Sequence, residues 1–116
     1  DVRRTIDRIF LEHGKINGVA NCIGSIFIKP LHMTTMENWS EVIRVNLTSC
    51  FCILKASLEK MAQQQQGSIV LVSSCAAQIG MPHHEAIAAA KGAIEALIRA
   101  AAASYAKKGI RVNGIA

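Results

Sequence analysis

The stretch Gly67–Leu97, GSIVLVSSCAAQIGMPHHEAIAAAKGAIEAL, decides the fold of this chain. It opens with a continuous run rich in Ile and Val, which is typical of a parallel strand covered on both faces. A serine pair ends this predicted strand, a loop with Gly80 and Pro82 follows, and a long alanine-rich helix carries Lys91. Ligands of open α/β sheets bind outside the carboxyl ends of the strands, so the serines and the lysine form a candidate site.

The rest of the chain repeats this alternation of strand and helix. Apolar residues at helical spacing predict a first, amphipathic helix that stops at Gly14. The elements that follow are predicted to be a strand within 18–24, a helix over 36–64, a strand over 68–74, a helix over 84–108 that Gly109 ends, and a strand over 110–116. This order predicts right-handed βαβ crossovers and therefore a parallel sheet of the α/β class.

The helix predicted over 36–64 is long for a globular domain. Thr34 and Glu37 match the S/T-x-x-E capping pattern and predict where it begins. Asn46, Thr48 and Ser49 lie in its middle and compete with the backbone for hydrogen bonds, so we expect a kink there.

Composition excludes several classes of function. The net charge is +5, but the basic residues are scattered and form no stripe with interleaved aromatics, so we expect a solvated basic surface and no nucleic-acid partner. No apolar run approaches the ~20 residues of a membrane span, and the first residues lack the apolar core of a secretory signal. We therefore expect no membrane association and a cytoplasmic location.

The cysteines and histidines do not form a metal-binding pattern. Cys22, Cys50, Cys52 and Cys75 contain no CxxC spacing and are expected to be free, buried thiols in a reducing compartment. The adjacent histidines His83 and His84 would need further ligands to bind a metal, and no other ligand residue is suitably spaced, so no metal site is expected.

Several segments, in order and at the right separations, together resemble the central part of the short-chain dehydrogenase/reductase family. They are Asp1-Val2, NCIG at 21–24, VNLTSCF at 45–51, GSIVLVSS at 67–74, AAAKGAIEAL at 88–97 and IRVNGIA at 110–116. The resemblance implies a Rossmann-like doubly wound parallel sheet, here a partial three-layer α/β/α unit with three strands and three helices. Residues 1–116 would form one partial Rossmann domain, without the N-terminal phosphate-binding βαβ unit and the C-terminal substrate segment.

The resemblance also implies NAD or NADP as the cofactor of the complete protein. Asp1 would contact the adenine, whereas Asn21 and Gly24 would hold the end of their strand against the ribose on the nicotinamide side. Lys91 would bind the hydroxyls of that ribose. Cys22 and Ile23 replace the second asparagine and the alanine of the family pattern NNAG, and both add bulk where backbone meets cofactor.

The implied chemistry is hydride transfer involving a small-molecule carbonyl or alcohol. Asn46 would position a water in a proton relay, and Ser74 would hydrogen-bond the substrate carbonyl. The family's catalytic tyrosine lies four residues before the lysine, and that position is Ile87 here. The enoyl-reductase variant of the pattern places its tyrosine seven residues before the lysine, where this chain has His84.

Two interpretations remain open for the activity. Tyr105 lies ~21 Å along the helix from Lys91 and cannot replace the missing tyrosine. The complete protein is therefore either an oxidoreductase with a weakened or altered proton donor, or a non-catalytic homologue with a cofactor-binding or oligomerising role. The two long helices, 36–64 and 86–106, resemble the family's subunit interfaces and imply a homodimer or homotetramer.

Overall fold

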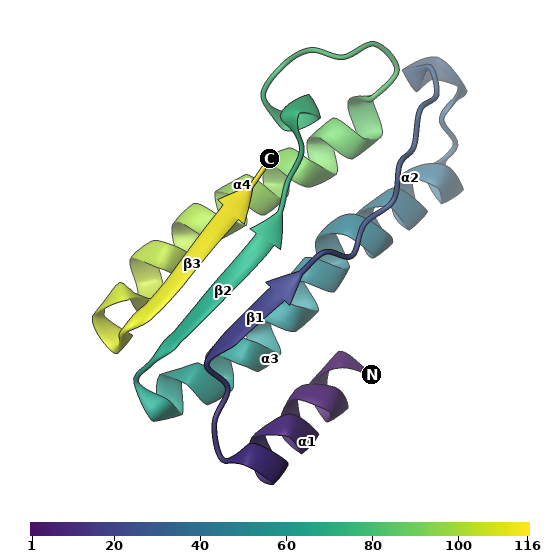
Figure 1. Ribbon diagram of the computed structural model, residues 1–116. Coiled ribbons are helices and arrows are strands. Elements are labelled where there is room, and N and C mark those ends of the chain that lie inside the picture. Colours follow the sequence, from purple (N-terminus) through teal and green to yellow (C-terminus); the bar gives the residue numbers. More distant parts are fainter.

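Three parallel strands form the centre of the protein in a computed structural model that describes residues 1–116. They are β1 (Gly18–Asn21), β2 (Gly67–Val72) and β3 (Ile110–Ile115), in the order β1-β2-β3. Both pairings are parallel, with Ala20 opposite Val70 and Val70 opposite Asn113. The predicted parallel α/β sheet is confirmed, and all three strands end at the same edge (Figure 1).

The helices cover one face of this sheet (Figure 1). They are α1 (Val2–His13), α2 (Met36–Val42), α3 (Ser49–Gln64) and α4 (Glu85–Tyr105). Burial along β2 alternates accordingly, because Ile69 and Leu71 are fully buried whereas Val70 and Val72 are half-buried. The partial unit thus contains two of the three layers, and the continuous apolar run of β2 is covered on one face rather than on both.

The helix predicted over 36–64 is continuous but irregular. A π-helical segment, Ile43–Thr48, joins α2 to α3 at the place where the sequence predicted a kink. Asn46 Nδ2 donates to the Val42 carbonyl at 2.9 Å, a bond that competes with the backbone ladder. The capping prediction was wrong by one residue, because Thr35 Oγ1 accepts from the amide of Asn38 at 3.2 Å. Thr34 instead donates its hydroxyl to the Pro30 carbonyl in the preceding turn.

Two glycines end helical segments as the sequence predicted. Gly14 follows α1 with φ 71°, and Gly109 follows the short 3₁₀ turn at the end of α4 with φ 70°. Both lie in the left-handed region, where a side chain is disfavoured. These caps turn the chain back toward the sheet.

The main core lies between the sheet and the helices. Its most completely buried apolar side chains are those of Met61, Ile69, Leu71 and Ile94. The helix α1 packs on α3, and two ion pairs support that contact: Lys60 Nζ lies 2.8 Å from Asp7, and Arg3 Nη2 lies 3.1 Å from Glu59. The apolar contact and these ion pairs hold α1 against α3.

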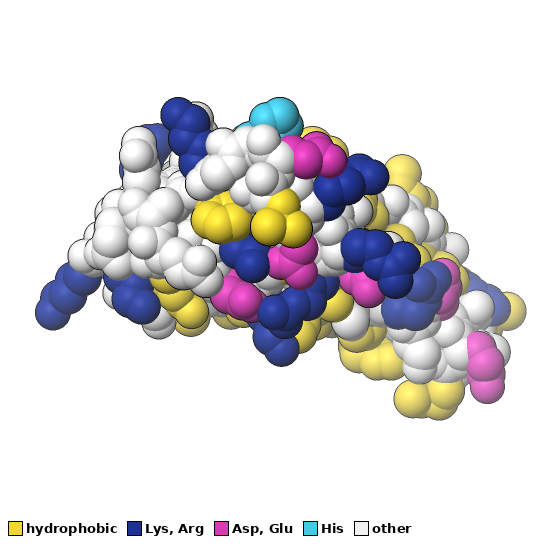
Figure 2. Space-filling view, turned by 90° about the horizontal axis from the view of Figure 1, so that it is seen from below, with side chains coloured by type: hydrophobic (Ala, Val, Ile, Leu, Met, Phe, Trp, Pro, Cys, Tyr) yellow, Lys and Arg dark blue, Asp and Glu magenta, His cyan; other side chains and the backbone are white.

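Charged side chains are dispersed over the surface. Figure 2 shows Lys and Arg side chains interspersed with acidic and apolar ones on the end away from the strand carboxyl ends. None of the helices combines the length and the hydropathy that a membrane span requires. The prediction of buried cysteines was wrong for three of them, since only Cys50 is buried whereas Cys22, Cys52 and Cys75 are exposed.

Candidate functional site

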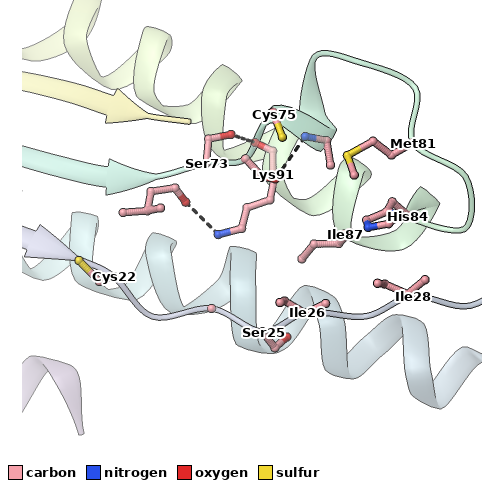
Figure 3. Close-up of a pocket in the computed structure, with 14 residues that line it drawn as sticks. Cys22, Ser25, Ile26, Ile28, Ser73, Cys75, Met81, His84, Ile87 and Lys91 are labelled. Atoms are coloured by element: carbon pink, nitrogen blue, oxygen red, sulfur yellow. Dashed lines mark hydrogen bonds between the residues drawn. The ribbon is translucent and has the colours of Figure 1, made fainter.

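A pocket of about 490 Å³ lies at the carboxyl ends of the strands. Three segments line it: residues 22–28 after β1, residues 72–76 at the end of β2, and residues 81–91 at the start of α4 (Figure 3). The pocket therefore lies where open α/β sheets bind their ligands. It brings together Gly24, Ser74 and Lys91, three of the residues that the sequence singled out.

The Lys91 ammonium is the charged group of the pocket wall. The residue is only 6% exposed, and its Nζ donates one hydrogen bond, to the Val72 carbonyl at 2.9 Å. A lysine ammonium has three donors, so two remain for a ligand. Because a buried charge is costly unless hydrogen bonds satisfy it, this lysine favours a ligand with hydroxyl or anionic oxygens.

Gly24 lets the chain pass close to this ammonium. A Cβ atom at Gly24 would lie 3.1 Å from Asn46 Oδ1 and 3.3 Å from Lys91 Nζ, closer than side chains normally pack. The loop after β1, the π-helical segment and α4 thus converge on one point. Residues 22–25 and Lys91 are far apart in the sequence and adjacent only in the fold.

Asn46 anchors that loop and has no exposed surface. Its Oδ1 accepts from the amide of Ser25 at 3.0 Å, and its Nδ2 donates to Ser25 Oγ and to the Val42 carbonyl, both at 2.9 Å. Both amide protons of the side chain are used within the chain. The contacts therefore give Asn46 a positioning role, and its part in a proton relay stays a prediction.

Asn21 has a similar anchoring role below the pocket. It is 2% exposed, its Oδ1 accepts from the amide of Ile23 at 3.1 Å, and its Nδ2 donates to Cys50 Sγ at 3.0 Å. Burial raises the pKa of the Cys50 thiol, against the opposing effects of the Asn21 hydrogen bond and of the Lys91 charge. Cys50 thus remains a neutral thiol at neutral pH, in keeping with its role as an acceptor that ties β1 to α3.

The two adjacent serines face different surroundings, one in the buried interior and one in the pocket wall. Ser73 is buried and donates its hydroxyl to the Glu95 carboxylate at 2.8 Å. Ser74 lines the pocket, and its Oγ accepts from the amide of Ala76 at 3.2 Å. The hydroxyl proton of Ser74 is consequently available to an acceptor atom in the pocket.

Ile87 lies between Lys91 and His84 on the pocket face of α4 (Figure 3). It is 5% exposed and packs with Val42, Ala86 and Ala90, so it contributes an apolar wall and no proton. His84 lies at the start of α4 and borders the same pocket, with its Nδ1 2.7 Å from the Pro82 carbonyl oxygen.

The predicted adenine contact, Asp1, lies outside the pocket wall. Its carboxylate caps α1 by accepting from the amide of Arg3 at 2.9 Å, and its contact with a cofactor stays a prediction. Sequence reasoning missed the apolar part of the wall, formed by Ile26, Ile28 and Met81. The rule that ligands bind beyond the strand carboxyl ends points to these segments, but only the fold shows which side chains face inward.

These features define a class of α/β proteins: a parallel Rossmann-type sheet with a serine and a buried lysine at the carboxyl ends of its strands. The family described as "Enoyl-(Acyl carrier protein) reductase" matches residues 1–116. The chain belongs to the short-chain dehydrogenase/reductase family.

The relatives that this chain matches are longer than the chain itself. The chain is 39% identical over 100 residues to "Inactive 2-(S)-hydroxypropyl-CoM dehydrogenase 2" of Xanthobacter autotrophicus, covering 86% of this chain and 44% of the relative. It is 33% identical over 110 residues to cyclopentanol dehydrogenase of Comamonas sp., covering 95% of this chain and 44% of the relative. The chain thus spans less than half the length of these relatives.

Solved structures share the fold closely. The structure of NAD⁺-bound xylitol dehydrogenase matches with a TM-score of 0.94 and 34% identity, over 99% of this chain and 45% of the other. The structure of ElxO with NADP bound matches with a TM-score of 0.96 and 27% identity, over 99% of this chain and 47% of the other. The Rossmann-like fold predicted from the sequence is therefore confirmed.

Proposed function

We propose that the complete protein is an NAD(P)-dependent oxidoreductase that transfers hydride between the cofactor and a small carbonyl or alcohol compound, with a proton donor other than tyrosine. The observation that carries this proposal is the buried Lys91 ammonium, which has one hydrogen bond within the chain and lies in a pocket with Ser74. Relatives whose structures contain NAD⁺ or NADP support the choice of cofactor.

The residues present fit the nicotinamide end of such a cofactor. Lys91 has two unused donors for ribose hydroxyls, and Gly24 keeps the space beside its Nζ free of a side chain. The bound cofactor supplies or accepts a hydride. The free hydroxyl of Ser74 donates a hydrogen bond to the oxygen of the substrate and thereby stabilises the negative charge that develops on that oxygen.

The missing tyrosine separates this proposal from the alternative. Ile87 has no proton to give, and a relative at 39% identity is named inactive, which favours a homologue that keeps the fold and has lost the chemistry. Such a homologue would bind cofactor or associate with other chains without turnover. Cofactor titration and rate measurement on the same preparation distinguish the two candidates.

Replacing Ile87 by tyrosine is the direct test of this defect. General acid–base catalysis contributes about 10²–10⁴-fold, and the other proton donor of the wild type already supplies part of this factor, so we expect Ile87→Tyr to raise the rate of ketone reduction with NADH or NADPH by less than about 10²-fold. Ile87→Phe is the matched control, because it adds the ring without the hydroxyl, and it should give no gain. Equal rates for wild type and Ile87→Tyr would contradict the claim that Ile87 limits catalysis, and a wild type that fails to bind cofactor would contradict the proposed function.

We also propose that α3 and α4 pair with a second copy of the chain. Phe51 is 49% exposed and borders a shallow apolar hollow with Leu47, Leu97 and the small residues Ala93, Ala96 and Ala100. Small residues on a helix face allow close helix approach. The proposal follows the family resemblance.

A charge placed on that face tests the pairing. Ala96 is exposed in the single chain, so Ala96→Arg should leave the fold intact and shift the complete protein to a lower molar mass in light scattering. Leu11→Arg on α1 is the control, because Leu11 is 83% exposed and lies on another helix. An unchanged mass for Ala96→Arg would exclude this face as the interface.

A further inference from the structure

We propose that His84 is the general acid and base of this pocket, exchanging the substrate proton through its Nε2 atom. The inference rests on the proposed function, because it names the group that takes the place of the missing tyrosine. It follows from the position of His84 in the pocket, from the tautomer that its neighbour imposes, and from the anchoring of its loop.

His84 lies on the same face of α4 as the other pocket residues. Positions 84, 87 and 91 are spaced three and four apart, and all three side chains line the pocket. Figure 3 shows the imidazole at the end of the pocket away from Cys22, next to Ile87 and Met81. The histidine is therefore one helical turn from the position that lost its tyrosine.

The Pro82 carbonyl sets the tautomer of this ring. His84 Nδ1 lies 2.7 Å from the Pro82 oxygen, which can only accept a hydrogen bond, so Nδ1 carries a proton. In the neutral ring Nε2 is then an unprotonated acceptor, and in the imidazolium it becomes a donor. Nε2 has no hydrogen-bond partner within the chain, so it is available for proton exchange with a molecule in the pocket.

The loop that holds His84 is tied to the opposite wall of the pocket. The amide of Lys29 donates to the His83 carbonyl at 2.9 Å, which joins the segment after β1 to the loop before α4. His83 itself has φ 64°, and its side chain is exposed and outside the pocket. The neighbouring histidines thus differ in role: the backbone of one fixes the loop, and the ring of the other borders the pocket.

Among the side chains at its end of the pocket, His84 is the one suited to exchange a proton with a substrate. Apolar side chains of Ile28, Met81 and Ile87 line the same end of the pocket (Figure 3). The other titratable residues of the pocket wall are Lys91, Cys22 and Cys75, and Glu85 follows His84 in the chain with an exposed side chain. Histidine is the side chain that ordinarily gains and loses a proton near neutral pH, as a two-way acid–base reaction requires.

The proton step balances in both directions. When a secondary alcohol is oxidised, the C–H bond breaks with its electron pair, which leaves as hydride to an oxidised nicotinamide, and the O–H proton passes to Nε2 of the neutral ring. When a ketone is reduced, the carbonyl carbon would receive hydride from a reduced nicotinamide, and the Nε2–H bond of the imidazolium would break to give its proton to the oxygen. Solvent returns the ring to its starting state after each turnover.

The test replaces each histidine of the pair by asparagine in the complete protein. The amide of His84→Asn can keep the hydrogen bond to the Pro82 carbonyl while Nε2 is lost, and His83→Asn is the matched control, because asparagine tolerates a positive φ. With NADH or NADPH and the probes cyclopentanone and acetophenone, we expect kcat to fall about 10²-fold for His84→Asn and by less than twofold for His83→Asn. The limb of the wild-type pH profile that requires a protonated acid should disappear in His84→Asn only.

A second readout does not depend on turnover. Nitrogen-15 NMR of the histidine rings should show the neutral His84 ring protonated at Nδ1, and a bound ketone should shift its Nε2 resonance. Cofactor binding, followed by nicotinamide fluorescence, separates the two claims. If the protein binds cofactor, three results would each overturn the role of His84 and leave the cofactor proposal standing. They are equal rates for the two variants, no turnover by the wild type, and a neutral His84 ring protonated at Nε2. Failure to bind either cofactor would overturn both.

Discussion

Replacing Lys91 by methionine is expected to weaken hydride transfer strongly without destabilising the protein. Methionine keeps much of the apolar stem of the lysine, which is 6% exposed, and removes the ammonium. The loss of one hydrogen bond to the Val72 carbonyl costs ~1 kcal/mol, and removing a charge from a buried site offsets this cost. The free energy of unfolding should therefore change by less than about 1 kcal/mol or rise.

The activity of Lys91→Met, in contrast to its stability, should fall. The two unused donors of Lys91 are those that would hold the ribose, so their loss should weaken NADH binding and lower kcat/KM by at least about 10²-fold. Lys107→Met is the control, because Lys107 is an exposed lysine beyond the end of α4. Measuring urea unfolding and cofactor fluorescence on both variants separates the effects. A Lys91→Met protein that is strongly destabilised yet binds cofactor normally would show that this lysine serves the fold and not the site.

The largest effect on stability is expected from Gly109→Ala. Gly109 has φ 70°, where alanine costs about 1–2 kcal/mol. Its Cβ would also lie 2.5 Å from the Gln65 carbonyl oxygen, which belongs to the backbone and cannot rotate away. The two costs together should lower the free energy of unfolding by about 3 kcal/mol or more, a large share of the stability of an ordinary domain.

Gly14→Ala provides the matched control for that substitution. Gly14 has almost the same backbone angle, φ 71°, but a Cβ there would meet nothing within 4 Å. It should therefore cost only ~1 kcal/mol, from the backbone conformation alone. Thermal and urea unfolding followed by circular dichroism measure both. Equal costs would mean that the contact between residue 109 and Gln65 relaxes freely.

Local sequence determined the elements and their order. The periodicity of apolar residues predicted the helices, Gly14 and Gly109 marked their ends, and the alternation with buried strands predicted a parallel sheet. These features depend on backbone conformation and on which side of one element is apolar, so neighbouring residues suffice to show them. The capping error of one residue at Thr34 reflects two adjacent threonines, either of which could cap a helix.

Only the tertiary structure decided how the site is assembled and what surrounds it. The sequence singled out Gly24, Asn46 and Lys91 through a family resemblance, but only the course of the loop after β1 brings Gly24 so close to the other two that an added Cβ would lie 3.1–3.3 Å from their side chains. The sequence also predicted that Cys22, Cys52 and Cys75 are buried, whereas they are exposed. Burial depends on which other elements cover a position, and the residues next to a cysteine do not show this. The serine, lysine and isoleucine of Gly67–Leu97 are a local pattern. That His84 lies in the same pocket is shown only by the fold, in which the Lys29–His83 hydrogen bond joins the loop before α4 to a distant segment.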